Sequence, residues 1–377
     1  MDQRDFSGLQ RLVVKVGTNV LSRNDRLDRE YLQELAAQIQ HLRGRGIEVC
    51  LVTSGAIGLG ARELGLTGRV SDIVLRQACA AVGQPILMEE YRRAFQAAGI
   101  LPAQVLLTRE VLNSRSSYVK LRNAVERLLE LGVVPVFNEN DSVSVSEIGS
   151  AFGDNDRLSA LIASKVDAEL LILLSDVGGY YSSDPRTDPE ALLLSRVDGV
   201  TAEMTAAAGS AGSMVGTGGM VTKLQAVRIA ASGGCRVVLA HGREERVLDR
   251  IVSGEEVGTV FSAHRRLRNK SRWILHSAPR GRIVVDAGAL EAIRNHKSLL
   301  PRGIVSVEGT FESGDVVLVN EAAKLVSAFS SRELERLAGL HSSQISTVLG
   351  GADDRKLIAR PEEMVFLEDD GIEESGV

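Results

Sequence analysis

Two lysines stand beside glycines, where a phosphate-binding protein could use them. Lys15 interrupts the apolar run "RLVVKVGTNVL" just before a glycine, whereas a P-loop places its lysine after the glycines, at a helix start. Lys223 follows "GTGG" near the start of a predicted helix, where the helix dipole disfavours a cation. A phosphate held by the loop amides would offset that cost. Alternatively, Lys15 is an accident of a strand end and Lys223 is a solvated surface lysine.

Carboxylate and amide side chains gather in the sequence between these two lysines. Asp141 follows a predicted strand, and "GDNDRLSALIA" supplies Asp154, Asn155 and Asp156 at the start of a predicted helix. Helix capping explains one of these three residues, but it does not explain all three together with Asp141. Such side chains are suited to hold an α-amino group or to order cationic catalytic groups.

Further candidate segments follow other predicted strands. The turn "TSGAIGLG", residues 53–60, can aim its amides at an anion, although a plain tight turn explains it equally well. "LLSD" ends in Ser175 and Asp176 and leads into a loop that is either the rim of a nucleotide pocket or an ordinary surface loop. Parallel α/β sheets bind ligands at the carboxyl ends of their strands. With no serine–histidine–acid order and no cysteine in a nucleophile context, the pattern suits phosphoryl transfer, in which the protein positions groups and neutralises charge.

A sheet is needed to bring these residues together. Apolar runs alternate with amphipathic helical patterns from residue 11 to about residue 262, and in 117–132 the helical pattern places Leu121, Val125, Leu128 and Leu129 on one face. This alternation predicts a three-layer α/β sandwich, in which helices cover both faces of a mostly parallel central sheet. The predicted strands span residues 11–17, 47–55, 100–108, 133–140, 169–176 and 235–242, and the clearest helices span 29–46 and 117–132.

Composition narrows the class of protein. The 377 residues are 44% hydrophobic and 25% charged, which is ordinary for a globular chain of two or three domains. The net charge of -5 argues against a protein dominated by non-specific nucleic-acid binding. No apolar run reaches the roughly 18 residues of a membrane helix and the N-terminus has no signal-peptide core, so we expect no membrane association and a cytoplasmic location. Cys50, Cys79 and Cys235 are predicted to be buried free thiols, and the absence of metal-ligand spacing predicts no protein metal site.

The character of the sequence changes after the first domain, which we place at residues 11–262. The polar, basic stretch "HRRLRNKSRW" predicts a linker over residues 263–279. Short β-like runs punctuated by glycine then predict a small, β-rich barrel domain over residues 280–358. Residues 361–377 are predicted to form a disordered acidic tail.

Six motifs in the first domain resemble those of the amino acid kinase family, in family order. They are "VVKVGTNVL", "VTSGAIGLG", "NENDSV", "FGDNDRLSALIA", "LLSDVGGYYSSDPR" and "GTGGMVTKLQAV", and they are most similar to those of members that phosphorylate glutamate. "KSRWI" and "SLLPRGIVSVEGTFESGDVV" resemble the PUA domain, an RNA-binding module in other proteins. The resemblance implies ATP-dependent phosphorylation of the γ-carboxylate of L-glutamate to L-glutamyl 5-phosphate plus ADP, the first step of proline synthesis. It also implies Mg²⁺ carried with the ATP and feedback inhibition by proline, and we expect a homo-oligomer.

The resemblance also implies roles for individual residues. Lys15 and Lys223 would stabilise the transferring phosphoryl group, and Asp156 would orient both lysines. Glutamate would be bound by Ser54, Asp141 and Asn155, with Asp154 shaping that site. The implied nucleotide site comprises Lys15, Ser175, Asp176, Thr217, Gly218, Gly219, Met220, Val221, Thr222 and Lys223. No general base is needed, because the attacking carboxylate is already ionised near neutral pH.

Three features depart from the family pattern. Asn19 stands where serine is more frequent, Ser175 replaces a threonine but keeps the hydroxyl, and the segment 142–152 is slightly longer. One alternative is a related kinase that acts on another carboxylate or on a nucleoside monophosphate. The other is an RNA-binding factor whose kinase-like domain is a scaffold. The charge-mixed second domain lacks a long basic and aromatic face, so we expect it to have a regulatory or assembly role instead.

Overall fold

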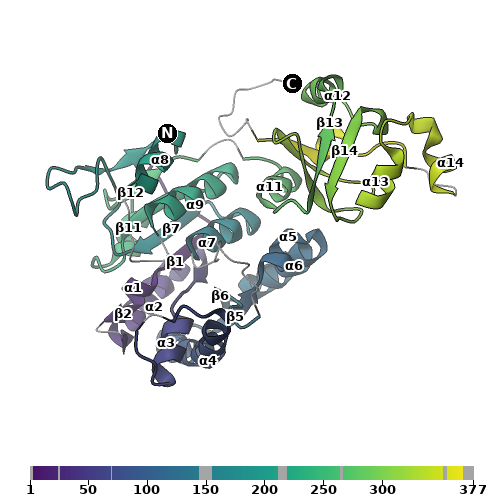
Figure 1. The fold of residues 1–377 in the computed structure, drawn as a ribbon. Helices are drawn as coiled ribbons and strands as arrows, with labels where there is room; N and C mark the ends of the chain where they lie inside the picture. The colour runs from purple at the N-terminus through teal and green to yellow at the C-terminus, as the bar shows by residue number, and fades with distance from the viewer. Residues whose placement is uncertain are drawn as a thin grey trace. The chain divides into compact units, whose positions relative to one another are not determined.

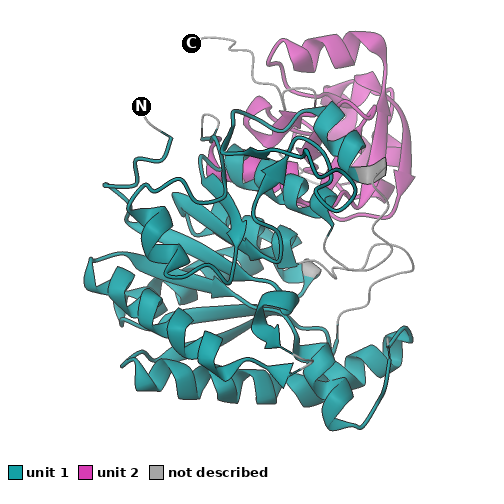
Figure 2. Cartoon of the chain, turned by 90° about the vertical axis from the view of Figure 1, so that its left-hand side faces the viewer, with its two compact units in different colours: residues 1–266 teal, residues 267–377 magenta. Residues whose placement is uncertain are grey.

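The computed structural model describes residues 3–23, 26–68, 70–143, 155–210, 219–263, 266–350 and 355–367. The chain divides into two compact units, residues 1–266 and residues 267–377 (Figure 2). Three residues of the predicted site, Asp154, Thr217 and Gly218, lie outside the described residues, as does most of the longer 142–152 segment. Within the described ranges, no helix is long and apolar enough to cross a membrane.

An eight-stranded sheet forms the centre of the first unit. The six predicted strands are present as β1 (Arg11–Val16), β4 (Glu48–Val52), β5 (Pro102–Leu107), β6 (Val134–Glu139), β7 (Leu170–Ser175) and β11 (Arg236–His241). All six run parallel in the order β11-β7-β1-β4-β6-β5, which confirms the mostly parallel sheet. At the β11 edge, β12 (Thr259–Phe261) pairs antiparallel with β11 and β10 (Arg196–Val197) pairs with β12.

The order of these strands creates a switch point beside β1. From β1 the chain builds β4, β5 and β6 on one side of it, and then crosses over to build β7 and β11 on the other side. Open α/β sheets bind their ligands outside the carboxyl ends of the strands at such a reversal. The residues that follow β1, β4, β6 and β7 are therefore brought to the edge of the sheet where a ligand is expected.

Helices cover both faces of the sheet, which confirms the three-layer prediction (Figure 1). One face carries α2 (Arg29–Gly44), α4 (Ile73–Ala97) and α10 (Val247–Val252), and the other carries α6 (Arg115–Glu130), α7 (Asn155–Lys165) and α9 (Met220–Ser232). The predicted helices at 29–46 and 117–132 correspond to α2 and α6. The remaining elements of this unit are α1 (Thr18–Leu21), α3 (Ala56–Glu63), α5 (Arg109–Asn113), α8 (Ala202–Ser210), and the short pairs β2–β3 (Ser22–Arg23, Arg26–Leu27) and β8–β9 (Tyr180–Tyr181, Leu193–Leu194).

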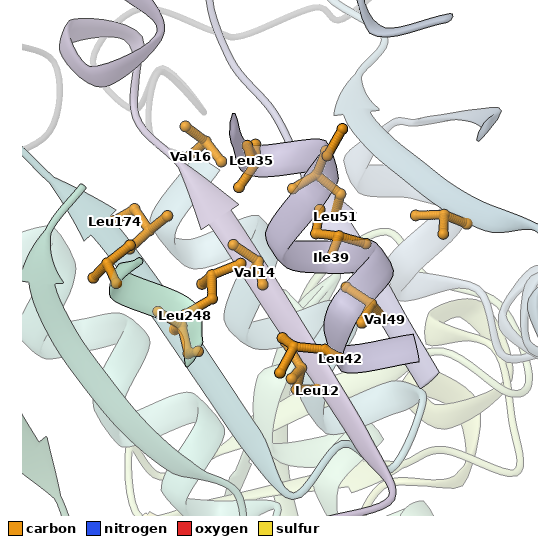
Figure 3. Close-up of a cluster of buried hydrophobic side chains, with 14 of the residues drawn as sticks. Leu12, Val14, Val16, Leu35, Ile39, Leu42, Val49, Leu51, Leu174 and Leu248 are labelled. Carbon is orange, nitrogen blue, oxygen red and sulfur yellow. The ribbon is translucent and has the colours of Figure 1, made fainter. Parts of the chain in front are cut away.

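The alternation of side chains along β1 decides where Lys15 points. Leu12, Val14 and Val16 belong to the core beneath α2 and α10, which Figure 3 shows in close-up. Val13 belongs to the opposite core, beneath α7 and α9. Because successive side chains of a strand point to opposite faces, Lys15 shares the face of Val13. The lysine therefore interrupts the valines on the side of the sheet where α7 and α9 begin.

The three cysteines are buried and free, as predicted. Cys50 belongs to the core beneath α7 and α9, and Cys235 lies in the same cluster. Cys79 is buried on α4. Burial raises the pKa of the Cys50 thiol to about 12, so this thiol stays protonated and unreactive at neutral pH.

The second unit is built on a five-stranded mixed sheet, which confirms a small β-rich domain. The strands are β13 (Gly281–Val285), β14 (Ile304–Gly309), β15 (Val316–Val319), β16 (Ala323–Val326) and β17 (Met364–Phe366), in the order β14-β13-β15-β16-β17. Its helices are α11 (Asn269–His276), α12 (Ala287–Arg294), α13 (Ser331–Leu337) and α14 (Ile345–Leu349), with 3₁₀ turns at Pro301–Gly303, Ser342–Gln344 and Pro361–Glu363. A separate hydrophobic core, which includes Phe311, Phe329 and Leu334, lies within this unit.

The boundaries of the second unit differ from those expected. About half of the predicted linker at 263–279 is α11, whose Trp273 and Ile274 are buried with Val316. The basic residues of this stretch made the helix hard to predict from the sequence, because the buried part of α11 spans only one helical turn. The predicted tail at 361–377 begins with the 3₁₀ turn Pro361–Glu363, and β17 follows it and pairs antiparallel with β16. This strand has only three residues, which is too short to be recognised from the sequence pattern. Residues 368–377 lie outside the described ranges.

Candidate active site

Lys15 and Lys223 converge on a single carboxylate at the carboxyl edge of the sheet. The ammonium of Lys15, near the end of β1, is paired with Oδ1 of Asp156 in the first turn of α7. The Nζ of Lys223, in the first turn of α9, lies 3.1 Å from Oδ2 of the same carboxylate. Asp156 is completely buried, and each lysine is only 6% exposed. Each carboxylate oxygen thus holds one cation, and the two ammonium groups are fixed beside each other.

The backbone after β1 is shaped to fit closely around Lys15. The amide of Gly17 donates a 3.1 Å hydrogen bond to the carbonyl of Leu174. A Cβ on Gly17 would lie 3.3 Å from that carbonyl oxygen and 3.6 Å from Nζ of Lys15. The contact with the carbonyl oxygen is tighter than most real Cβ contacts, so a side chain at Gly17 would push the turn away from the strand end. Glycine therefore lets the turn lie against the lysine.

A second acidic group, Asp176, stands at the end of β7. Asn19 donates a 2.7 Å hydrogen bond to its Oδ2, and the hydroxyl of Ser175 donates a 3.0 Å bond to its Oδ1. Burial alone would raise the pKa of Asp176, but these hydrogen bonds and the nearby charge of Lys223 bring the pKa below its usual value. Asn19, one of the two residues that depart from the family pattern, therefore helps to keep a predicted nucleotide-site carboxylate in its ionised form.

Asn155, the residue before Asp156, joins a different cluster. Its side-chain nitrogen contacts the carbonyl of Thr53, Oγ of Ser54 at 2.9 Å and Oδ1 of Asn138 at 2.9 Å. The structure thus brings the predicted substrate residues Ser54 and Asn155 together, from the ends of β4 and the start of α7. Gly55 makes this possible with a φ of 98°, in the left-handed region, where it begins α3.

Asn138 and Gln84 belong to this polar cluster but were not among the predicted site residues. Asn138 donates a 2.8 Å hydrogen bond to Oε1 of Gln84 on α4. Asn138 lies within the "NENDSV" motif, so its position after an apolar strand was a usable signal. Gln84 follows an alanine- and glycine-rich helical stretch and carries no local sign of its partner.

Asp141 lies in the turn after β6 and has an unusual titration. Burial raises the pKa of its carboxyl to about 6, and the charge of Arg76 opposes this shift. Among the described residues, Asp141 makes no direct hydrogen bond to Ser54 or Asn155. The structure thus places it at the same edge of the sheet without joining it to the amide cluster.

The glycine-rich loop is described from Gly219 onward. Gly219 precedes the first turn of α9, where Met220, Val221 and Thr222 lie with Lys223. The hydroxyl of Thr222 donates a 2.7 Å hydrogen bond to the carbonyl of Gly219 and so closes the start of the helix. The positive end of the helix dipole lies at this turn, which makes the turn suited to an anionic group.

The fold and the site together define the class of protein. A mostly parallel three-layer domain holds two lysines and a shared acid at its switch point, and residues 10–241 match the amino acid kinase family. The chain belongs to the amino acid kinase family. Residues 281–349, within the second unit, match the PUA domain.

Curated relatives show which members of the family this chain is similar to. The chain is 43% identical over 368 residues to a glutamate 5-kinase of Methanosarcina mazei, an alignment that covers 94% of this chain and 96% of that protein. It is 45% identical over 353 residues to a glutamate 5-kinase of Syntrophotalea carbinolica, covering 92% of this chain and 94% of that protein. Because these alignments run through both units, the similarity extends to the appended second domain.

Proposed function

We propose that this chain is a glutamate 5-kinase, which transfers the γ-phosphoryl group of ATP to the γ-carboxylate of L-glutamate. The products are L-glutamyl 5-phosphate and ADP, and the reaction is the first step of proline synthesis. The observation that carries the proposal is the pairing of Lys15 and Lys223 with one buried carboxylate. Relatives that align with 92% and 94% of this chain bear the name glutamate 5-kinase.

The two lysines supply the charge that the reaction requires. Phosphoryl transfer spreads negative charge over the transferred group, and catalysis consists mainly of positioning and neutralising it. Lys15 approaches from a strand end and Lys223 from a helix start, so the two ammonium groups can contact the same phosphoryl group from different directions. Asp156 holds the two ammonium groups at fixed positions relative to each other. Mg²⁺, carried by the ATP phosphates, would add further neutralising charge.

The amide and acid groups beyond the lysines are suited to the amino acid. The nitrogen of the Asn155 amide is directed at protein acceptors, so its oxygen remains to accept from the α-ammonium of glutamate. Ser54 presents a hydroxyl at the same place, and ionised Asp141 adds an acceptor for a cation. Asp154 is proposed to complete this site.

The nucleotide is proposed to lie over Ser175, Asp176 and the loop from Thr217 to Lys223. The start of α9 is suited to a phosphate because the positive end of the helix dipole lies there and the ammonium group of Lys223 stands in the same turn. Asp176 accepts hydrogen bonds from Asn19 and Ser175, as expected of a carboxylate that is kept ionised at the rim of this site.

A hydroxamate assay tests the proposal directly. The protein is incubated with ATP, Mg²⁺, glutamate and hydroxylamine, which traps the acyl phosphate as γ-glutamyl hydroxamate. Parallel incubations without hydroxylamine, with N-acetylglutamate, aspartate or UMP as the acceptor and release of ADP as the readout, separate the related kinase activities, because phosphorylated UMP is not an acyl phosphate and forms no hydroxamate. Glutamate is expected to be the preferred acceptor, and absence of hydroxamate from glutamate would refute the proposal. Adding proline to the same assay tests feedback inhibition, which we propose together with a homo-oligomeric assembly.

A further inference from the structure

The side-chain amides of Asn155, Asn138 and Gln84 form an amide cluster beside Ser54. Two backbone groups fix which way the amides of Asn155 and Asn138 face. Asn155 contacts the carbonyl of Thr53, which can only accept a hydrogen bond, so the atom of Asn155 facing it is the nitrogen. The backbone N–H of Glu139 can only donate, and it lies 3.0 Å from Oδ1 of Asn138. These two contacts fix both amides without any assumption about substrate.

Gln84 completes the cluster as an acceptor. Because the Oδ1 of Asn138 faces Glu139 and Asn155, its Nδ2 points the other way and donates to Oε1 of Gln84 at 2.8 Å. Gln84 is only 8% exposed. Its own Nε2 is buried and has no hydrogen-bond partner among the described residues. An apolar side chain at position 84 would avoid the cost of burying that unpaired amide nitrogen, so the useful group of the Gln84 side chain is its oxygen.

Close helix packing holds Gln84 in place. A Cβ on the preceding residue, Gly83, would lie 1.8 Å from the carbonyl oxygen of Ala56, and a Cβ on Gly60 would lie 1.8 Å from that of Cys79. The backbones of α3 and α4 therefore touch directly in the turn of α4 that leads into Gln84. The same α4 segment cannot shift without moving α3, which begins at the substrate-facing turn after β4.

We propose that Gln84 is a positioning residue for glutamate, which acts through Asn138 to hold the amide of Asn155. The proposal rests on the proposed glutamate kinase activity. The Oε1 of Gln84 anchors Nδ2 of Asn138, and this bond keeps Oδ1 of Asn138 on Nδ2 of Asn155. The oxygen of Asn155 then faces the α-ammonium of the substrate. Gln84 itself touches neither substrate nor nucleotide.

The Gln84→Met variant removes the acceptor but keeps the size of the side chain. We expect the KM for glutamate to rise about tenfold, while kcat and the KM for ATP stay within about twofold, because one hydrogen bond that positions only the substrate is lost. The preference for glutamate over glutarate, which lacks the α-ammonium, should fall by about the same factor. Gln84→Glu keeps an acceptor oxygen and should restore most of the loss. Gln96→Met, the same change at an exposed position of α4, is the matched control.

A double-mutant cycle tests whether Gln84 acts through Asn138. Asn138→Asp keeps the acceptor for Glu139 and Asn155 but removes the donor to Gln84, so its effect on the glutamate KM should not add to that of Gln84→Met. Additive effects, an unchanged glutamate KM, or an equal rise in the KM for ATP would each overturn the proposal. Thermal unfolding of every variant identifies loss of fold, and Asn138→Asp supplies the same test if Gln84→Met does not fold. If the wild-type protein yields no hydroxamate from glutamate, the proposed function and this inference both fail.

Discussion

Asn155 and Asp156 are adjacent at the start of α7, yet their side chains serve two different clusters. The nitrogen of Asn155 contacts Ser54 and Asn138, while the carboxylate of Asp156 holds Lys15 and Lys223. Neighbouring residues in the first turn of a helix point about 100° apart, so one turn can face two sites at once. This turn therefore joins the group that we propose binds glutamate to the groups that we propose stabilise the phosphoryl group.

Replacing Asp156 by asparagine should destabilise the protein as well as inactivate it. Both lysines would lose the carboxylate they share, and removing one partner of a buried ion pair typically costs about 3–5 kcal/mol. We expect a fall of that order in the free energy of unfolding by urea, together with a large drop in kcat. Asp198→Asn, at an exposed aspartate, should change neither quantity. A fully stable Asp156→Asn protein would mean that the lysines do not depend on this charge.

Replacing Lys223 by alanine should slow turnover while the protein still folds, because Asp156 keeps its ion pair with Lys15. Contacts that act mainly in the transition state are typically worth about 2.7–4 kcal/mol, which corresponds to a fall of about 10²–10³ in kcat. The measurement is single-turnover formation of hydroxamate. Lys120→Ala, at an exposed lysine of α6, is the control. Wild-type turnover in Lys223→Ala would remove this lysine from the mechanism.

Asp141 should make glutamate binding depend on pH. Its pKa is raised by burial to about 6, so the carboxyl becomes ionised only as the pH rises through that value. If the ionised form accepts from the α-ammonium, the KM for glutamate should fall as the pH rises through about 6. The pH profile of kcat/KM measures this, and Asp141→Asn should show a weaker but flat profile. An unchanged slope in the variant would assign the titration to another group.

The same shift should make Asp141 unfavourable for stability at neutral pH. The native carboxyl keeps a proton between pH 3.8 and about 6 that the unfolded chain has lost, so its contribution to stability is largest at low pH and falls as the pH rises through about 6. Asp141→Asn should therefore raise the Tm above pH 6 while it weakens glutamate binding. A lower Tm for the variant at pH 8 would contradict this account.

Replacing Asn19 should change the KM for ATP and leave the KM for glutamate unchanged. Removing its side chain in Asn19→Ala deletes the 2.7 Å bond that helps to keep Asp176 ionised and oriented. We expect the KM for ATP to rise about fivefold, the effect of one hydrogen bond to a charged group at a partly exposed site. Asn19→Ser, which restores the commoner residue, should recover part of the loss. A change confined to the glutamate KM would place Asn19 in the other half of the site.

Whether an element or a site residue can be predicted from the sequence depends on how far apart its interacting residues lie in the chain. The strands and the helices α2 and α6 were predictable, because their apolar periods are local properties of the chain. Asn138 could have been found from its motif, but Gln84 could not, because its partner lies on another element and its neighbours are small and apolar. The helix α11 and the strand β17 were missed for a related reason. Each is short, and each is stabilised by packing on the second sheet instead of by its own composition.

The amino-acid sequence by itself determined the order of strands and helices, the family and the types of residue available for phosphoryl transfer. These follow from local periodicity and from motifs that can be recognised without contacts. Only the tertiary structure decided that Lys15 and Lys223 share Asp156, that Asn19 donates to Asp176, and that Gln84 accepts from Asn138. Those relationships join residues far apart in the chain. They depend on which face of a strand each side chain takes and on how closely the helices pack.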